Sequence, residues 1–222
     1  MRMESNWAAE HLQVIRTLME RSALYRRALA PVMIFNGCMG AIAAIIGWAA
    51  EIDSPSGFIT YWAVIGLLAI GGSFFLVRRQ ALSASEPFWS PPTRRVTQAM
   101  LPPLIAGAII SVFVLVRLAS FQRAAPQNPM FPAAVAMLWL PEAWIVLYGC
   151  AFHAAGFFMP RGMKLFGWAF ILGGCALFAA GIPPFRVSRL AFSHSVMGLF
   201  FGVFHLAYGI YLFYTEKRRD ET

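Results

Sequence analysis

The sequence predicts an all-α polytopic membrane protein, a bundle of six transmembrane helices preceded by an amphipathic juxtamembrane helix. Three observations predict this class. Of the 222 residues, 59% are hydrophobic and only 13% are charged, whereas soluble domains carry about 25% charged residues. Apolar segments long enough to cross the hydrocarbon core recur along the chain. The basic residues gather at alternate ends of these segments, as they do in membrane proteins.

The N-terminal segment 1–28 has the pattern of an amphipathic helix. Its mainly apolar face carries Trp7, His11, Val14, Ile15, Leu18, Ser22 and Tyr25. Charged side chains such as Glu20 and Arg27 lie mostly on the opposite face. A helix of this kind lies on the inner membrane surface or packs beneath the bundle. At that surface it could also bind a protein partner.

Six apolar segments follow, each long enough to span a bilayer. They cover residues 29–51, 57–77, 97–119, 131–159, 163–183 and 190–214. Pro102 and Pro103 interrupt the third span, although neighbouring helices can replace the lost backbone hydrogen bonds. The fourth span is longer than the bilayer requires, so Pro132 and Pro141 predict a tilt or a kink.

Two connecting segments are predicted to be irregular. Residues 83–95 are rich in Pro and Ser and should be non-helical in the middle, with Phe88 and Trp89 positioned to dip into the membrane interface. Residues 120–130 should form a polar exterior connection. The transmembrane domain is therefore expected over 29–215.

The basic residues predict the orientation. Of the 18 lysines and arginines, 14 lie on the side that holds the N-terminal segment and the charged tail 216–222. Because cytoplasmic loops carry an excess of Lys and Arg, both termini are predicted to be cytoplasmic in a bacterial inner membrane. The net charge of +8 is concentrated at the ends of the spans. The expected partner of this charge is the lipid headgroup, not nucleic acid.

Four ionisable side chains lie at bilayer depth: Glu142 and His153 in span four, and His194 and His205 in span six. Each costs about 2.5–3.5 kcal/mol to insert, so such groups usually face the bundle interior. The two residues of each pair are eleven positions apart. In an α-helix they therefore lie on one stripe, about 16 Å from each other along the helix axis. If spans four and six touch, Glu142 lies near His194 and His153 lies near His205. Tyr148 can join this seam.

The chain carries few other signals of chemistry. It has no GxSxG, HExxH, P-loop, GxGxxG or CxxC motif, so the sequence offers no catalytic motif and leaves enzyme activity open. The lack of Asp within a span argues against intramembrane aspartyl proteolysis, and the lack of Lys in the middle of a span argues against a retinal Schiff base. Cys38, Cys150 and Cys175 fall in apolar stretches and are expected to be packing residues. Gly198 and Gly202 form a small-xxx-small pattern that predicts close helix packing.

Three segments resemble a family of uncharacterised bacterial six-helix membrane proteins. They are VIRTLMERSALYRRAL (14–29), AWIVLYGCAF (143–152) and FFGVFHLAYGIYL (200–212). In that family an IRxxMER juxtamembrane helix precedes the spans, and the last span carries FGxxHxxxG, here Phe201, Gly202, His205 and Gly209. The resemblance implies a six-helix fold and no particular activity. It points to His205 ahead of His194 as the residue to test.

The leading functional hypothesis is a membrane protein that binds or passes an ion or small ligand at a polar seam between spans four and six. Its ligand-binding residues would be Glu142, Tyr148, His153, His194 and His205. One alternative is a non-catalytic interaction or sensory subunit, in which the N-terminal helix contacts a partner or a second copy.

Two further interpretations of the same residues remain open. In one, His153 and His205 ligate a b-type haem, although span four offers only one histidine where membrane cytochromes usually use two. In the other, the polar groups only hydrogen-bond neighbouring helices and fix their packing.

Overall fold

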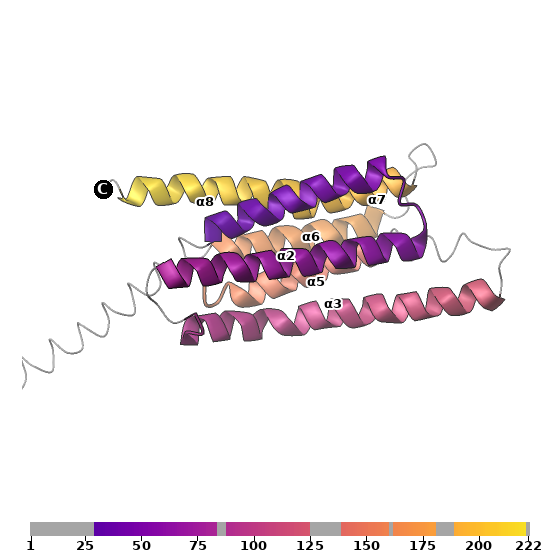
Figure 1. Cartoon of the computed structure of the whole chain (residues 1–222), viewed down its shortest axis with the longest axis horizontal. Helices are drawn as coiled ribbons and strands as arrows, with labels where there is room; N and C mark the ends of the chain where they lie inside the picture. Colours follow the sequence, from indigo (N-terminus) through magenta and orange to yellow (C-terminus); the bar gives the residue numbers. More distant parts are fainter. Residues whose placement is uncertain (1–28, 84–87, 125–138, 160–161, 181–188, 221–222) are drawn as a thin grey trace, which may run out of the picture.

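The computed structural model describes residues 29–83, 88–124, 139–159, 162–180 and 189–220. Within these residues every regular element is a helix (Figure 1), which confirms the all-α class. After a first helix, Leu29–Ala49, come α2 (Pro55–Ser83), α3 (Pro91–Ala124), α5 (Leu140–Ala155), α6 (Gly162–Ala180), α7 (Arg189–Met197), the π-helix η2 (Gly198–Phe204) and α8 (His205–Asp220).

Five helices among the described residues are long and apolar enough to cross a membrane. They are Leu29–Ala49, Pro55–Ser83, Thr93–Phe121, Gly162–Ala180 and Phe192–Thr215. Their positions match the predicted spans one, two, three, five and six, and they are consistent with a multi-pass membrane protein. The fourth predicted span, 131–159, is described only from residue 139, and there it forms α5. The six-span count therefore stays a prediction, as does the N-terminal helix 1–28, which lies outside the described residues.

Several helices extend beyond their predicted ends. The third passes through Pro102 and Pro103 without a break and continues to Ala124, so the first part of the predicted exterior connection is helical. The last helix continues to Asp220 and includes most of the predicted tail. Of the predicted irregular segment 83–95, residues 88–90 are indeed non-helical.

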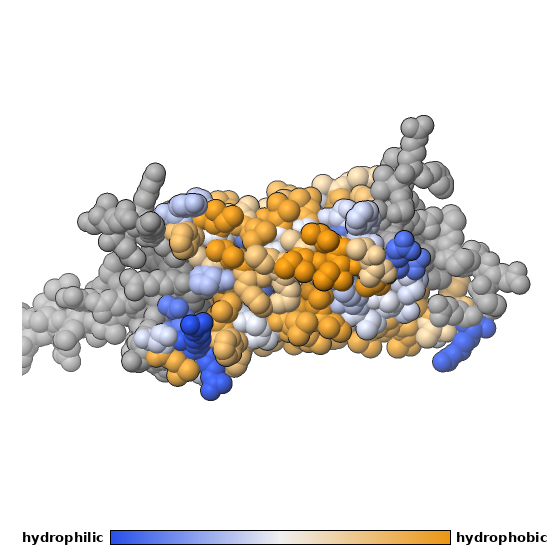
Figure 2. Space-filling view, turned by 45° about the horizontal axis from the view of Figure 1, so that its top comes forward, coloured by the Kyte–Doolittle hydropathy of each residue, from blue (hydrophilic) through white to orange (hydrophobic). Residues whose placement is uncertain are grey.

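The surface of the bundle suits a lipid environment. The helices run side by side along one long axis (Figure 1), and Figure 2 shows an apolar band across the middle of the molecule with polar patches toward both ends. Leu67 in α2, and Ile109 and Val112 in α3, are each more than 60% exposed. Soluble monomers rarely expose apolar patches of this extent.

Small residues bring the first helix against the last span, which comprises α7, η2 and α8. A Cβ atom added at Gly202 would lie 2.9 Å from the backbone nitrogen of Ala41, and one added at Gly37 would lie 2.6 Å from that of Leu206. A side chain at Gly198 would also meet the first helix. The predicted close packing at Gly198 and Gly202 is confirmed, and Gly37 supplies part of the facing surface.

A second glycine contact joins α5 to α6. A Cβ atom at Gly149 would lie 2.7 Å from the carbonyl oxygen of Gly167, and one at Gly167 would lie 2.6 Å from the backbone nitrogen of His153. Gly174 similarly approaches Val146. One face of α5 is therefore turned toward α6, and this decides where the polar residues of α5 lie.

Candidate functional site

The two histidines of the last span lie on either side of its π-helical segment. A π turn contains more residues than an α turn because its hydrogen bonds join residues five apart. The seven residues of η2 therefore change the angular relation between His194 and His205. His194 contacts the first helix and α2, whereas His205 contacts α5 and α6. The prediction that they share one stripe is wrong, because it assumed an uninterrupted α-helix.

His205 is buried and both of its ring nitrogens are hydrogen-bonded. Its Nδ1 lies 3.0 Å from the carbonyl oxygen of Phe200, and its Nε2 lies 2.7 Å from the hydroxyl of Tyr148 in α5. A carbonyl oxygen can only accept, so Nδ1 carries the proton and Nε2 accepts from the phenol. In the neutral ring this assigns the proton to Nδ1. The pair links α5, in the predicted span four, to the last span; the sequence placed Tyr148 in the seam between these spans but paired His205 with His153.

Aromatic rings enclose this Tyr148–His205 pair. The imidazole centroid lies within 6.3 Å of the ring centroids of Phe152, Phe166, Phe170 and Phe201. These rings come from α5, α6 and η2. Such close packing makes the pair a fixed part of the core.

His194 is equally buried, and its bonds indicate the opposite tautomer. The indole Nε1 of Trp62 in α2 donates to its Nδ1 over 3.2 Å, and its Nε2 lies 3.4 Å from the carbonyl oxygen of Ile52. Indole nitrogen is only a donor, so Nδ1 holds the lone pair and Nε2 carries the proton. The ring also covers Gly47, where a side chain would collide with the imidazole.

Sequence reasoning missed the partners of His194. Trp62 carries no ionisable group, and nothing in the sequence indicates which helix meets span six. A usable signal was present: a tryptophan in a span needs an acceptor for its N–H, and a membrane interior offers few.

Glu142 and His153 lie on the stripe of α5 that faces α6. This stripe also carries Val146 and Gly149, which meet Gly174 and Gly167 of α6. The eleven-residue spacing puts Glu142 and His153 on one face of α5, and among the described residues the glycine contacts of that face are with α6.

Each of these two side chains holds a buried polar atom without a partner among the described residues. Glu142 is 5% exposed, and its Oε2 accepts no hydrogen bond from them. The Nδ1 atom of His153 is likewise unpaired within the described part of the chain. The His153 ring packs edge-on against Phe157 and against Trp168 of α6.

The predicted pairing of His153 with His205 is not formed. Phe152 turns toward His205, so the next residue, His153, points about 100° away around the helix. A bis-histidine haem takes one nitrogen from each imidazole at the two axial positions of its iron. The Nε2 atom of His205 is instead bonded to Tyr148 and its Nδ1 to the carbonyl oxygen of Phe200, and His153 is directed away from this ring. The arrangement therefore does not fit a haem held between His153 and His205.

The described residues hold no group of three or more His, Cys, Asp or Glu side chains suited to a metal ion. No family model, curated protein or solved structure matches the chain. Function must therefore be inferred from the arrangement of its own side chains.

Proposed function

We propose that this chain is a multi-pass protein of the bacterial cytoplasmic membrane, with both termini in the cytoplasm, that binds and releases a proton at Glu142. The observation that carries the proposal is the buried carboxyl of Glu142, whose Oε2 has no hydrogen-bond partner among the described residues. Carboxyl groups at membrane depth are costly and commonly mark ion or proton pathways.

The surroundings of Glu142 favour a proton over a metal ion. Calcium requires six to eight oxygen ligands, and magnesium requires a near-octahedral set. Among the described residues, no group of three or more His, Cys, Asp or Glu side chains could hold such an ion. A proton needs only one acceptor, and it removes the charge that makes a buried carboxylate unfavourable.

In this proposal the hydrogen-bonded pairs Tyr148–His205 and Trp62–His194 are fixed parts of the bundle and do not take up the proton. Tyr148 and Trp62 already occupy the lone pair of each imidazole, and backbone carbonyls occupy each N–H. His153 remains a candidate second proton acceptor, because it lies on the same stripe of α5 as Glu142 and its Nδ1 is unpaired among the described residues.

Carbodiimide labelling tests the proposal directly. Dicyclohexylcarbodiimide enters apolar regions and reacts with protonated carboxyl groups, and intact mass spectrometry detects the adduct. We expect the full-length protein in its membrane to be labelled once, less as the pH rises, and the Glu142→Gln variant to remain unlabelled.

The matched control is Glu51→Gln, which removes an exposed carboxyl near the end of the first helix. This variant should label like the wild type. Labelling that persists in Glu142→Gln, or that does not depend on pH, would contradict a titrating carboxyl at Glu142.

A further inference from the structure

One end of the bundle carries a cluster of arginines and aromatic side chains that the proposed function does not use. We define the α2–α3 end as Arg78, Arg79, Phe88, Trp89, Arg94 and Arg95. All four arginines are exposed. Across residues 78–95 the sequence has only one acidic residue, Glu86, so this stretch carries a net positive charge.

Ring packing and hydrogen bonds hold the two helix ends together. Phe88 packs edge-on against Phe74 of α2, with 4.8 Å between the ring centroids. The hydroxyl of Thr93 donates to the carbonyl of Phe88 over 3.0 Å, and the Ser90 hydroxyl lies 2.9 Å from that of Thr93. The turn before α3 is therefore fixed against α2, with one arginine pair on each side of it.

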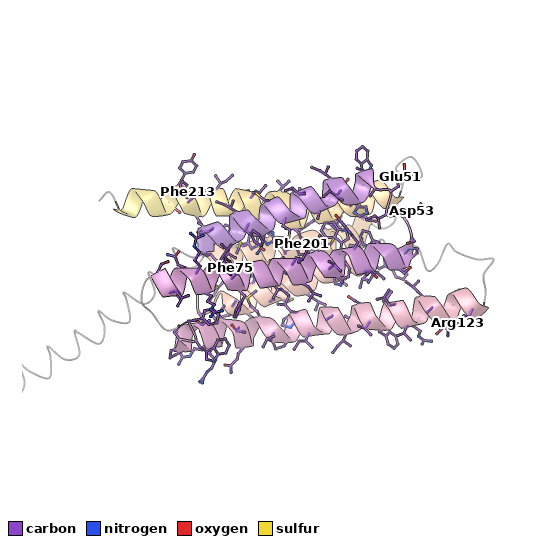
Figure 3. The ribbon with its side chains drawn as sticks, viewed as in Figure 1. Glu51, Asp53, Phe75, Arg123, Phe201 and Phe213 are labelled. Atoms are coloured by element: carbon purple, nitrogen blue, oxygen red, sulfur yellow. The ribbon has the colours of Figure 1, made fainter. Side chains whose placement is uncertain are left out.

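An apolar surface continues directly from this basic end. Trp89 is 58% exposed, and Phe74 and Phe75, one turn before Arg78 and Arg79, are 52% and 63% exposed. Exposed tryptophan at the end of a span is typical of the headgroup level of a bilayer. The acidic side chains Glu51 and Asp53 lie at the opposite end of the bundle from Phe75 (Figure 3).

We propose that the α2–α3 end binds the phosphate of an anionic phospholipid. The planar guanidinium group matches phosphate oxygens with paired N–H donors. Clusters of basic residues next to a transmembrane helix attract anionic lipids. The exposed Phe74 and Phe75 rings lie where an acyl chain would follow its headgroup, which favours a lipid over free phosphate. This site is independent of Glu142.

Lipid retention tests this site. The full chain is reconstituted in phosphatidylcholine nanodiscs with or without phosphatidylglycerol, and native mass spectrometry then measures the lipid that it retains after extraction. We expect retention of phosphatidylglycerol to fall about tenfold or more when all four arginines are changed to Gln. The control Arg117→Gln/Arg123→Gln, which removes two arginines from the other end of α3, should retain it like the wild type.

Equal retention by the quadruple variant and the wild type would overturn the site, as would an equal loss in the control. Thermal stabilisation by inorganic phosphate alone, equal to that by phosphatidylglycerol, would also overturn it.

If the quadruple variant does not fold, fluorescence quenching by phosphatidylglycerol with brominated acyl chains replaces the assay. We expect brominated phosphatidylglycerol to quench the tryptophan fluorescence more strongly than brominated phosphatidylcholine does. This difference between the two lipids should be lost in Trp89→Phe, and equal quenching of the wild type by both lipids would overturn the site.

Discussion

At the scale of single residues, the two buried histidines of the last span are hydrogen-bonded to partners on different helices. Tyr148 donates to His205, and Trp62 donates to His194. Each remaining ring N–H faces a backbone carbonyl. Buried polar groups with complete hydrogen bonding fix one arrangement of helices, because any other would leave a donor or acceptor unpaired.

The Tyr148–His205 bond should be measurable as a coupling free energy. Hydrogen bonds between membrane helices average about 0.6 kcal/mol and reach about 1.7 kcal/mol. We expect a double-mutant cycle of Tyr148→Phe and His205→Phe, followed by unfolding in mixed detergent micelles, to give a coupling in this range. A parallel cycle with the exposed Tyr211→Phe should give none. Zero coupling at Tyr148 would show that the bond does not stabilise the fold.

The sequence identified the polar residues but not most of their partners. Glu142, Tyr148, His194 and His205 stand out because ionisable and hydroxyl groups are rare in apolar spans. The sequence placed Tyr148 and His205 in one seam between spans four and six but paired His205 with His153, so the Tyr148–His205 bond itself was not predicted. The need of Trp62 for an acceptor was readable from the sequence, but its pairing with His194 was not, because nothing in the sequence shows which helices meet the last span.

At the scale of elements, glycines decide which helices touch. The first helix and the last span approach through Gly37, Gly198 and Gly202, and α5 and α6 approach through Gly149 and Gly167. Without a hydrophobic force between helices in lipid, such close contact supplies much of the association energy. The small-xxx-small pattern in span six was readable from the sequence, whereas its partner helix was not.

Substitution at these glycines should separate contact positions from open ones. Gly202→Ala places a methyl group against the backbone of Ala41, and we expect a loss of about 1–3 kcal/mol of unfolding free energy. Gly66→Ala in α2 meets nothing within 4 Å, so it should be neutral or stabilising by up to about 1 kcal/mol. Denaturation in detergent measures both variants. Equal effects would mean that the Gly202 contact does not hold the helices together.

Helix positions were easier to predict than helix ends. Hydropathy located spans one, two, three, five and six, because lipid requires a continuous apolar helix. It underestimated the lengths of α2 and α3, since charged residues such as Arg78 and Arg123 continue a helix beyond the hydrocarbon core. Pro102 and Pro103 lie within α3 because a proline removes one backbone bond without ending a helix that other interactions hold.

At the scale of the whole molecule, the charges distinguish the two ends of the bundle. Arg78, Arg79, Arg94 and Arg95 lie where α2 ends and α3 begins, while Glu51 and Asp53 lie in the connection at the other end (Figure 3). The excess of basic residues at one end predicts that this end faces the cytoplasm.

Cysteine accessibility in intact cells tests this orientation. In a background where Cys38, Cys150 and Cys175 are changed to Ser, we expect Asp53→Cys to react with a membrane-impermeant maleimide added outside. Ser90→Cys should react only after the membrane is permeabilised. The reverse pattern would invert the assigned topology, and labelling of both from outside would exclude a single orientation.

The opposite tautomers of the two imidazoles give them different responses to an added charge. At His205 the extra proton would bind Nε2, and the Tyr148 hydroxyl can rotate and become the acceptor. At His194 it would bind Nδ1, which faces the indole N–H of Trp62, a group that can never accept. His205 can therefore become cationic with its neighbour in place, whereas His194 must part from α2 to do so.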